Sequence, residues 1–165
     1  MNIIQTKIGT IDIEKHQIIT FESGLPGFEN LSKFIVYTDD SIAPILWLVS
    51  IEDSEIAFPV IPPKNVRIDY SFFIPQEVVD YLEISKEEDL VILSVLTIPQ
   101  QSQEISLNLI APMLISLINK KGIQLILDNT QYKSKHLLKE ELERSQNLLK
   151  QSAGEDNAGS DEKNQ

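Results

Sequence analysis

Apolar residues occur along the first 130 positions in short runs that turn-forming residues separate. Lys33 to Thr38 is rich in β-branched and aromatic residues, which pack well on a pleated surface. Ile45 to Ile51, Ile56 to Ile61 and Leu90 to Ile98 are apolar at nearly every position, a pattern typical of strands buried on both faces. Further strands are expected near Gly9 and at Gln17 to Phe21, Ile105 to Leu109, Met113 to Ile118 and Ile123 to Leu127. The chain is therefore predicted to be mainly β.

Two segments carry helical signals. Pro75 to Leu82 begins with a proline, has acidic residues early and continues with an apolar stripe, as expected for a short helix. Residues 134–150 contain a narrow apolar stripe that includes Leu138, Leu142 and Leu149. This stripe predicts an amphipathic C-terminal helix. Many short strands with one or two short helices favour a β domain closed as a barrel or sandwich.

The chain divides into three parts by composition. Residues 1–133 hold all the predicted strands and form the expected domain, and residues 134–150 form the expected C-terminal helix. Residues 151–165 contain no large apolar side chain, so they cannot bury enough surface to offset the entropy of ordering. We expect this tail to be disordered.

The net charge of −11 is the first functional indication. Between Asp69 and Asp89 there are seven acidic residues and one base, Lys86. Such a surface repels nucleic acid, which is a polyanion, and attracts a basic protein. Solubility is the simpler explanation of the acidity, and it stays open at this point. Within the segment, Glu87, Glu88 and Asp89 are the best candidates for contact with a basic partner.

Residue patterns that carry enzyme chemistry are missing from the sequence. There is no cysteine, and His16 and His136 are not spaced as metal ligands. No glycine-rich phosphate loop or serine nucleophile elbow occurs. The adjacent acids Asp39 and Asp40 are more typical of a solvated turn than of a general acid–base pair. We therefore expect a protein that is not an enzyme and that needs no cofactor or metal.

The segment from Phe21 to Glu29 reads Phe-Glu-Ser-Gly-Leu-Pro-Gly-Phe-Glu. Two glycines that bracket a proline specify a tight loop. Leu25 and Phe28 lie within it, and a loop with such residues either tucks them into the core or presents them to a partner. The residues alone leave these two alternatives open, so Leu25 and Phe28 are candidate partner anchors.

This segment resembles the FPEGLPGFE signature of the FliW family of flagellar assembly factors, with Glu22-Ser23 where Pro-Glu is more usual. Further blocks that resemble the family follow in the right order: Trp47 to Pro62, Asp89 to Pro99, Ser106 to Pro112 and Gln124 to Tyr132. Together they cover about residues 1 to 136. The motif positions carried over to this chain are Gly24, Pro26, Gly27, Asn108, Pro112, Asn129 and Tyr132.

The resemblance implies a small pseudo-barrel of antiparallel strands and two protein partners. Members of the family bind CsrA, an RNA-binding translational repressor, and relieve its repression of flagellin synthesis. They also bind flagellin, which titrates the factor and frees the repressor. Two other functions remain as alternatives from the residues: an acidic nucleic-acid mimic that acts on another basic protein, and a small enzyme.

The expected location is the cytoplasm. The N-terminus shows no basic stretch followed by an apolar run, which a secretory signal would have. The most apolar stretch, Ile105 to Ile118, contains polar residues and a proline and falls short of the ~20 residues of a membrane span. We expect neither membrane nor direct nucleic-acid binding.

Overall fold

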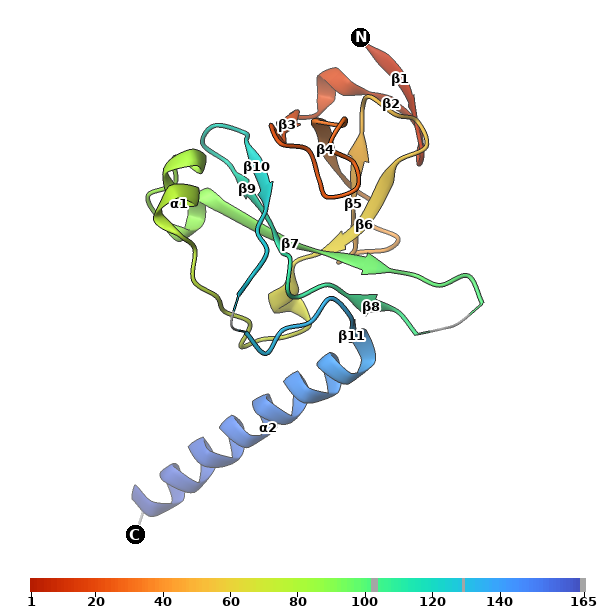
Figure 1. Ribbon diagram of the computed structural model, residues 1–165. Helices are drawn as coiled ribbons and strands as arrows, with labels where there is room; N and C mark the ends of the chain where they lie inside the picture. Colours follow the sequence, from red (N-terminus) through yellow and green to blue (C-terminus); the bar gives the residue numbers. More distant parts are fainter. Residues whose placement is uncertain (102–103, 129, 164–165) are drawn as a thin grey trace.

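The computed structural model describes residues 1–101, 104–128 and 130–163, with side chains described as far as residue 154. It is mainly β with two helices, as predicted (Figure 1). The strands are β1 (Ile3–Thr6), β2 (Gly9–Asp12), β3 (Ile19–Thr20), β4 (Lys33–Thr38), β5 (Leu46–Ser50), β6 (Ala57–Ile61), β7 (Leu90–Thr97), β8 (Ser106–Leu107), β9 (Met113–Ser116), β10 (Gly122–Gln124) and β11 (His136–Leu137). The helices are α1 (Gln76–Leu82) and α2 (Leu138–Lys163), with short 3₁₀ turns at Ile13–Lys15, Pro63–Asn65 and Glu87–Asp89.

The main sheet is antiparallel and runs in the order β10-β9-β7-β6-β5-β4-β3, with β8 paired to β7 and β11 paired to β8. Its two ends approach each other at Thr20, whose N–H donates to the carbonyl of Lys120 at 2.9 Å. Within the described residues, one isolated bridge between Thr20 and Lys121 is the only ladder pairing between β3 and the start of β10. The closed pseudo-barrel therefore stays a prediction.

The apolar runs supply the core, as their pattern predicts. Phe34, Leu48 and Val60 are fully buried on one side of the sheet, where Phe34 meets Phe21 edge to face with ring centroids 5.5 Å apart. Val49 belongs to a second buried cluster, with Ile35 of β4 and Ile11 of β2. Each such side chain contributes ~1.5–3 kcal/mol on burial, so β4, β5 and β6 contribute strongly to the stability of the fold.

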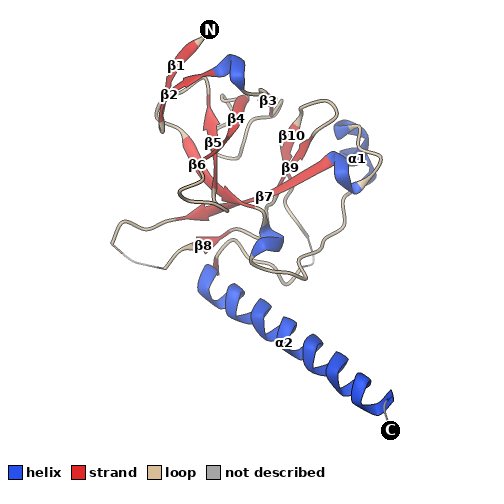
Figure 2. Cartoon of the chain, turned by 180° about the vertical axis from the view of Figure 1, so that it is seen from behind, coloured by secondary structure: helices blue, strands red, loops and turns tan. Residues whose placement is uncertain are grey.

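Helix α1 lies at one end of β7 and β9, as Figure 2 shows from behind. It follows Pro75 and ends at Glu83, which adopts the left-handed conformation with φ of 53°. The buried Ser116 hydroxyl donates to the carbonyl of Leu82 at 2.6 Å, and the Asn119 side-chain amide donates to the carbonyl of Tyr81 at 3.0 Å. These bonds satisfy the last carbonyls of the helix and fix its position.

Helix α2 differs from its prediction in two ways. Residues 136–137 form a short strand that pairs with β8, so the helix begins at Leu138. The predicted stripe also matches the buried face only at Leu138, which packs against the core, because Leu142 and Leu149 are 39% and 58% exposed while Glu141 and Ser145 are buried. The reason is that the surface under α2 presents polar partners, which select the face with Glu141 and Ser145.

The structure also continues α2 to Lys163, through most of the tail that we expected to be disordered. Extending a helix that has already formed costs less free energy than starting one. Residues 151–154 are exposed, so this part of the extension gains no buried contact. The last two residues, 164–165, lie outside the described residues.

Candidate protein-interaction surfaces

The Phe21–Glu29 loop is a closed structural unit. Gly24 and Gly27 have φ of 67° and 86°, a region that L side chains rarely adopt. A Cβ atom at Gly24 would lie 2.6 Å from the Cα of Glu29, so only glycine fits there. The N–H of Phe28 donates to the carbonyl of Leu25 at 2.7 Å, which folds the loop back on itself.

The structure places Leu25 in the core, where it is 4% exposed, and thereby decides between the two alternatives for this residue. Phe28 is half-buried and meets Phe58 edge to face, with ring centroids 5.2 Å apart. Leu25 cannot contact a partner while the loop is closed, and Phe28 offers only part of its ring. Pro26 lies between them and is exposed. The loop therefore does not present its apolar residues as anchors.

Three further motif positions also have structural roles. The Asn108 side-chain oxygen accepts hydrogen bonds from the N–H groups of Ile110 and Ala111 at 3.2 and 3.0 Å, forming a turn before β9. The Pro112 carbonyl accepts from the N–H of Leu125. The buried Tyr132 hydroxyl accepts from the N–H of Ser71 at 3.1 Å. Asn129 lies outside the described residues.

The structure divides the three candidate acids Glu87, Glu88 and Asp89. Asp89 is buried, and its carboxylate accepts from the N–H groups of Ser85 and Lys86 at 2.9 and 3.2 Å. The Ser85 hydrogen bond is the main cause that lowers the pKa of Asp89. Asp89 is therefore a turn-stabilising residue, and only Glu87 and Glu88 are exposed to a partner.

The exposed acids gather around α1. Glu77, Asp80 and Glu83 belong to the helix or its C-terminal cap, and all three are exposed, as are Glu87 and Glu88. Glu87 also lines a groove of ≈400 Å³ with Pro62, Phe72, Ile74 and Ile92 among its apolar lining. We call these five acids the acidic face.

Asp69, the first acid of the segment, is paired instead. Arg144 of α2 donates to its two carboxylate oxygens, each at 2.6 Å. This bidentate contact is the main cause that lowers the pKa of Asp69 to about 2. Because its charge is paired with Arg144, Asp69 does not belong to the acidic face. The pair links the segment before α1 to α2.

A buried charge network fixes the start of α2, and the sequence did not indicate it. The guanidinium of Arg67 donates to Glu141 at 3.2 Å and lies 4.9 Å over the Tyr132 ring. His136 contacts the same carboxylate at 3.0 Å, and the Lys133 N–H donates to the other ring nitrogen at 2.8 Å. The Ser145 hydroxyl donates to the Val66 carbonyl at 2.6 Å. In the sequence, only the i, i+4 spacing of Glu141 and Ser145 could have indicated that these two polar residues share one face of the helix.

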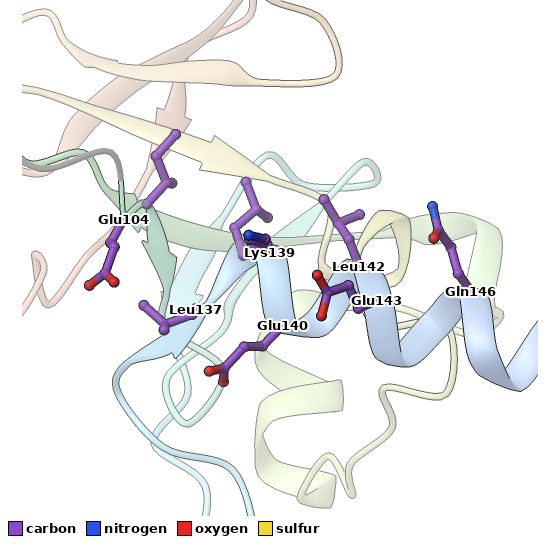
Figure 3. A pocket seen from close by; sticks show the side chains of 9 residues that line it. Glu104, Leu137, Lys139, Glu140, Leu142, Glu143 and Gln146 are labelled. Carbon is purple, nitrogen blue, oxygen red and sulfur yellow. The ribbon is translucent and has the colours of Figure 1, made fainter.

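A groove of ≈590 Å³ runs beside this attachment (Figure 3). Most of the side chains labelled in Figure 3 come from α2, while Leu137 comes from β11 and Glu104 from the segment before β8. The lining mixes leucines with acidic groups and Lys139. It gives no arrangement of a nucleophile, a base and an oxyanion donor that catalysis would use.

Among the described residues, no group of three or more His, Asp or Glu side chains is placed to hold a metal ion. In the same part of the chain, no helix has the length and apolar character needed to cross a membrane. The surface that the structure describes carries grooves, exposed acids and exposed apolar side chains. The class that the fold defines is a small, mainly β domain built on an antiparallel sheet.

Comparison with known proteins assigns the family. The family model described as FliW protein matches residues 2–138, which ends where α2 begins. Flagellar assembly factor FliW of Thermotoga neapolitana is 44% identical over 148 residues, which are 89% of this chain and 99% of the relative. The corresponding protein of Pseudothermotoga lettingae is 46% identical over 151 residues, or 91% and 96% of the two chains.

A solved structure agrees with these relatives. The crystal structure of a flagellar assembly factor FliW superposes with a TM-score of 0.76 at 33% identity, covering 82% of this chain and 96% of that one. The chain belongs to the FliW family of flagellar assembly factors, as the motif blocks in its sequence indicate. The mainly β fold with two helices is the fold of that structure.

Proposed function

We propose that this chain acts in flagellum assembly as a non-catalytic partner switch in the cytoplasm. It binds CsrA, which relieves repression of flagellin mRNA translation, and it binds flagellin, which competes for it and frees CsrA again. Family membership supports the role in flagellar assembly. The observation that carries the CsrA part is the acidic face around α1, because an RNA-binding protein presents a basic surface.

The acids of the acidic face are expected to affect the rate at which CsrA binds more than the affinity of the complex. Exposed charge pairs each contribute roughly 0–1 kcal/mol, so no single acid of the acidic face decides the affinity. Their sum steers a basic partner and raises its association rate. A carboxylate-rich protein docked beside an RNA site also repels RNA, which weakens RNA binding without any need to occupy the base contacts.

The direct test is a three-component competition. Labelled leader RNA of the flagellin gene is bound to CsrA, the purified chain is titrated in, and fluorescence anisotropy follows RNA release. We expect the chain to release RNA and added flagellin monomer to restore RNA binding. If the chain leaves the RNA complex intact at concentrations well above those of CsrA, the proposed CsrA contact is wrong.

The flagellin contact has its own readout. Size-exclusion chromatography of the chain with flagellin monomer is expected to give a co-eluting complex, and bovine serum albumin in place of flagellin serves as the acidic control. Separate elution of the two proteins would contradict the switch even if RNA release is observed. Capture of other basic proteins, with neither CsrA nor flagellin retained, would favour the alternative of a nucleic-acid mimic.

A further inference from the structure

Two apolar side chains are unusually exposed on opposite sides of one groove. Phe73 is 83% exposed and Ile126 is 62% exposed. Both line a groove of ≈380 Å³ whose described lining comes from residues 71–75, residues 125–128 and Thr130. Figures 1 and 2 both show the segment that leads to α1 beside the segment that follows β10. Large apolar side chains gathered on one surface are typical of a binding site.

The segment after β10 has a free backbone edge at this groove. The N–H groups of Leu125 and Leu127 donate to carbonyls of the 110–112 segment at 2.9 and 2.8 Å. Since successive residues of a strand direct their backbone groups to opposite edges, those of Ile126 point to the other side. Among the described residues, the backbone of Ile126 has no hydrogen-bond partner.

The opposite wall is also extended. Exposure alternates from Ser71 to Ile74, with Ser71 and Phe73 outward and Phe72 and Ile74 half-buried, which is the period of a strand. The backbone groups of residues 72–74 form no hydrogen bond with any described residue. The groove therefore lies between two extended segments, and strand edges of this kind are templates for pairing with another chain.

The charge around the groove is negative. Asp128 lines it, and α1, with Glu77 and Asp80 exposed, starts directly after Pro75 of the lining. No lysine or arginine is among the described lining residues. A second copy of this chain, with its net charge of −11, would meet like charge here. The chain's own tail, with four acids and one lysine after residue 154, would meet it too.

We propose that this groove binds an extended, basic segment of a protein partner by strand addition. The segment pairs with the free edge at Ile126 and inserts an apolar side chain between Phe73 and Ile126. Its lysine or arginine residues lie toward Asp128 and the start of α1. In this mode backbone hydrogen bonds give affinity and the side-chain pocket gives specificity. The inference rests on the proposed function only in that the chain works by binding proteins.

The test uses a synthetic ten-residue peptide of alternating lysine and valine, with a glutamate–valine peptide as the charge control. The lysine peptide is titrated into the ¹⁵N-labelled full chain and followed by NMR. We expect amide shifts confined to residues 71–75 and 125–128 and no binding of the glutamate peptide. Shifts centred elsewhere, or equal binding of both peptides, would overturn the proposal.

A matched pair of variants localises the site. Ile126→Ser is expected to weaken the lysine peptide about tenfold, as loss of an apolar anchor does. Ile118→Ser changes the same residue type, 57% exposed, on the β9–β10 turn at the other end of the hairpin, and should leave binding unchanged. Equal effects of the two variants would contradict the placement. Circular dichroism melts confirm that both variants are folded.

Backbone pairing has a separate test. A lysine–valine peptide with N-methylated amides at alternate positions cannot pair along one edge and is expected to lose binding. Retained affinity of this peptide would contradict strand addition, because it would show that the groove binds a helix or only a side chain of the peptide. Neither peptide contains CsrA or flagellin sequence, so failure here leaves the RNA-competition test unaffected.

Discussion

Two segments of this chain carry prolines and large apolar side chains outside the strands, and they have opposite fates. In the Phe21–Glu29 loop, Leu25 is 4% exposed and belongs to the core. In residues 71–75, Phe73 is 83% exposed at the wall of a groove. The first segment is a family motif and the second is not among the motif blocks of the sequence.

Backbone conformation accounts for the difference. Positive φ at Gly24 and Gly27 lets the first segment reverse and bond to itself, which carries Leu25 inward. The second segment has no glycine, stays extended and alternates its side chains between the core and solvent. The most recognisable motif of this chain therefore shapes the domain, while the exposed Phe73 lies in a segment outside the motif blocks.

The largest expected effect is loss of the loop reversal in Gly24→Ala. The substitution adds left-handed strain and a Cβ contact of 2.6 Å with backbone, for a destabilisation of roughly 3–5 kcal/mol. Gly27→Ala is the matched control, because φ is positive but no atom lies within 4 Å, and strain alone costs ~1–2 kcal/mol. Urea denaturation measures both, and equal effects would contradict the role of the close contact.

The next effect separates the two apolar side chains directly. Leu25→Ala removes a buried side chain and should cost ~2–5 kcal/mol in unfolding free energy. Phe73→Ala removes a larger but exposed one and should change stability by no more than ~0.5 kcal/mol. Denaturant melts of the two variants check this. A large loss in Phe73→Ala would mean that the 71–75 segment is packed, which would remove the basis for the groove as a binding site.

Much of the fold followed from the sequence because hydrophobic runs mark strands well. The predicted strand Lys33 to Thr38 coincides with β4, and the helix after Pro75 is α1. The short strand β11 was not predicted, because two residues carry no period. The buried face of α2 was predicted only at Leu138, because Glu141 and Ser145 are polar and become buried only through contacts with residues 74 and 79 positions away.

The interaction surfaces were less predictable. Local composition gave Glu87, Glu88 and Asp89 the same weight, and only the three-dimensional turn shows that Asp89 faces backbone N–H groups. Ile126 lay inside the apolar run Ile123 to Leu127 that was predicted as a strand, but β10 ends at Gln124, and the exposure of Ile126 depends on which segments pack around it. The sequence alone does not show which segments of the chain lie next to Ile126.

A smaller effect concerns the anchor that precedes the 71–75 segment. Because Arg144 lowers the pKa of Asp69 to about 2, this pair stabilises the fold above the unfolded pKa of 3.8 and the contribution is lost as pH falls toward 2. Both groups are over a third exposed, so solvent screening limits the contribution to less than ~1 kcal/mol.

Asp69→Asn tests this anchor. The variant should be less stable than wild type at pH 6, and the difference should shrink below pH 3.8 and be mostly lost at about pH 2, the folded pKa of Asp69. Arg144→Gln should show the same profile, since it removes the other half of the pair. Unfolding free energies from urea melts between pH 2 and pH 6 provide the measurement. A difference in unfolding free energy that grows as pH falls would contradict a stabilising ion pair between Asp69 and Arg144.

The smallest expected effect is that of removing residues 151–165. Like Phe73, the start of this segment is exposed and outside the core. Truncation should leave the melting temperature and flagellin binding unchanged. A stop after residue 137 is the contrasting variant, since it also removes Glu141 and Ser145 and should unfold the attachment at Arg67. A clear loss in the shorter truncation would assign the tail a role that its composition does not indicate.

The most direct test of the partner-binding account is the association rate of CsrA at two salt concentrations. Stopped-flow kinetics compare wild type, Glu87→Gln/Glu88→Gln on the acidic face, and Glu140→Gln/Glu143→Gln on α2, which removes the same charge from exposed positions elsewhere. We predict slower association and a weaker salt dependence for the first variant only, because local charges steer the encounter. An unchanged rate and salt slope in that variant, or equal changes in both, would contradict the account.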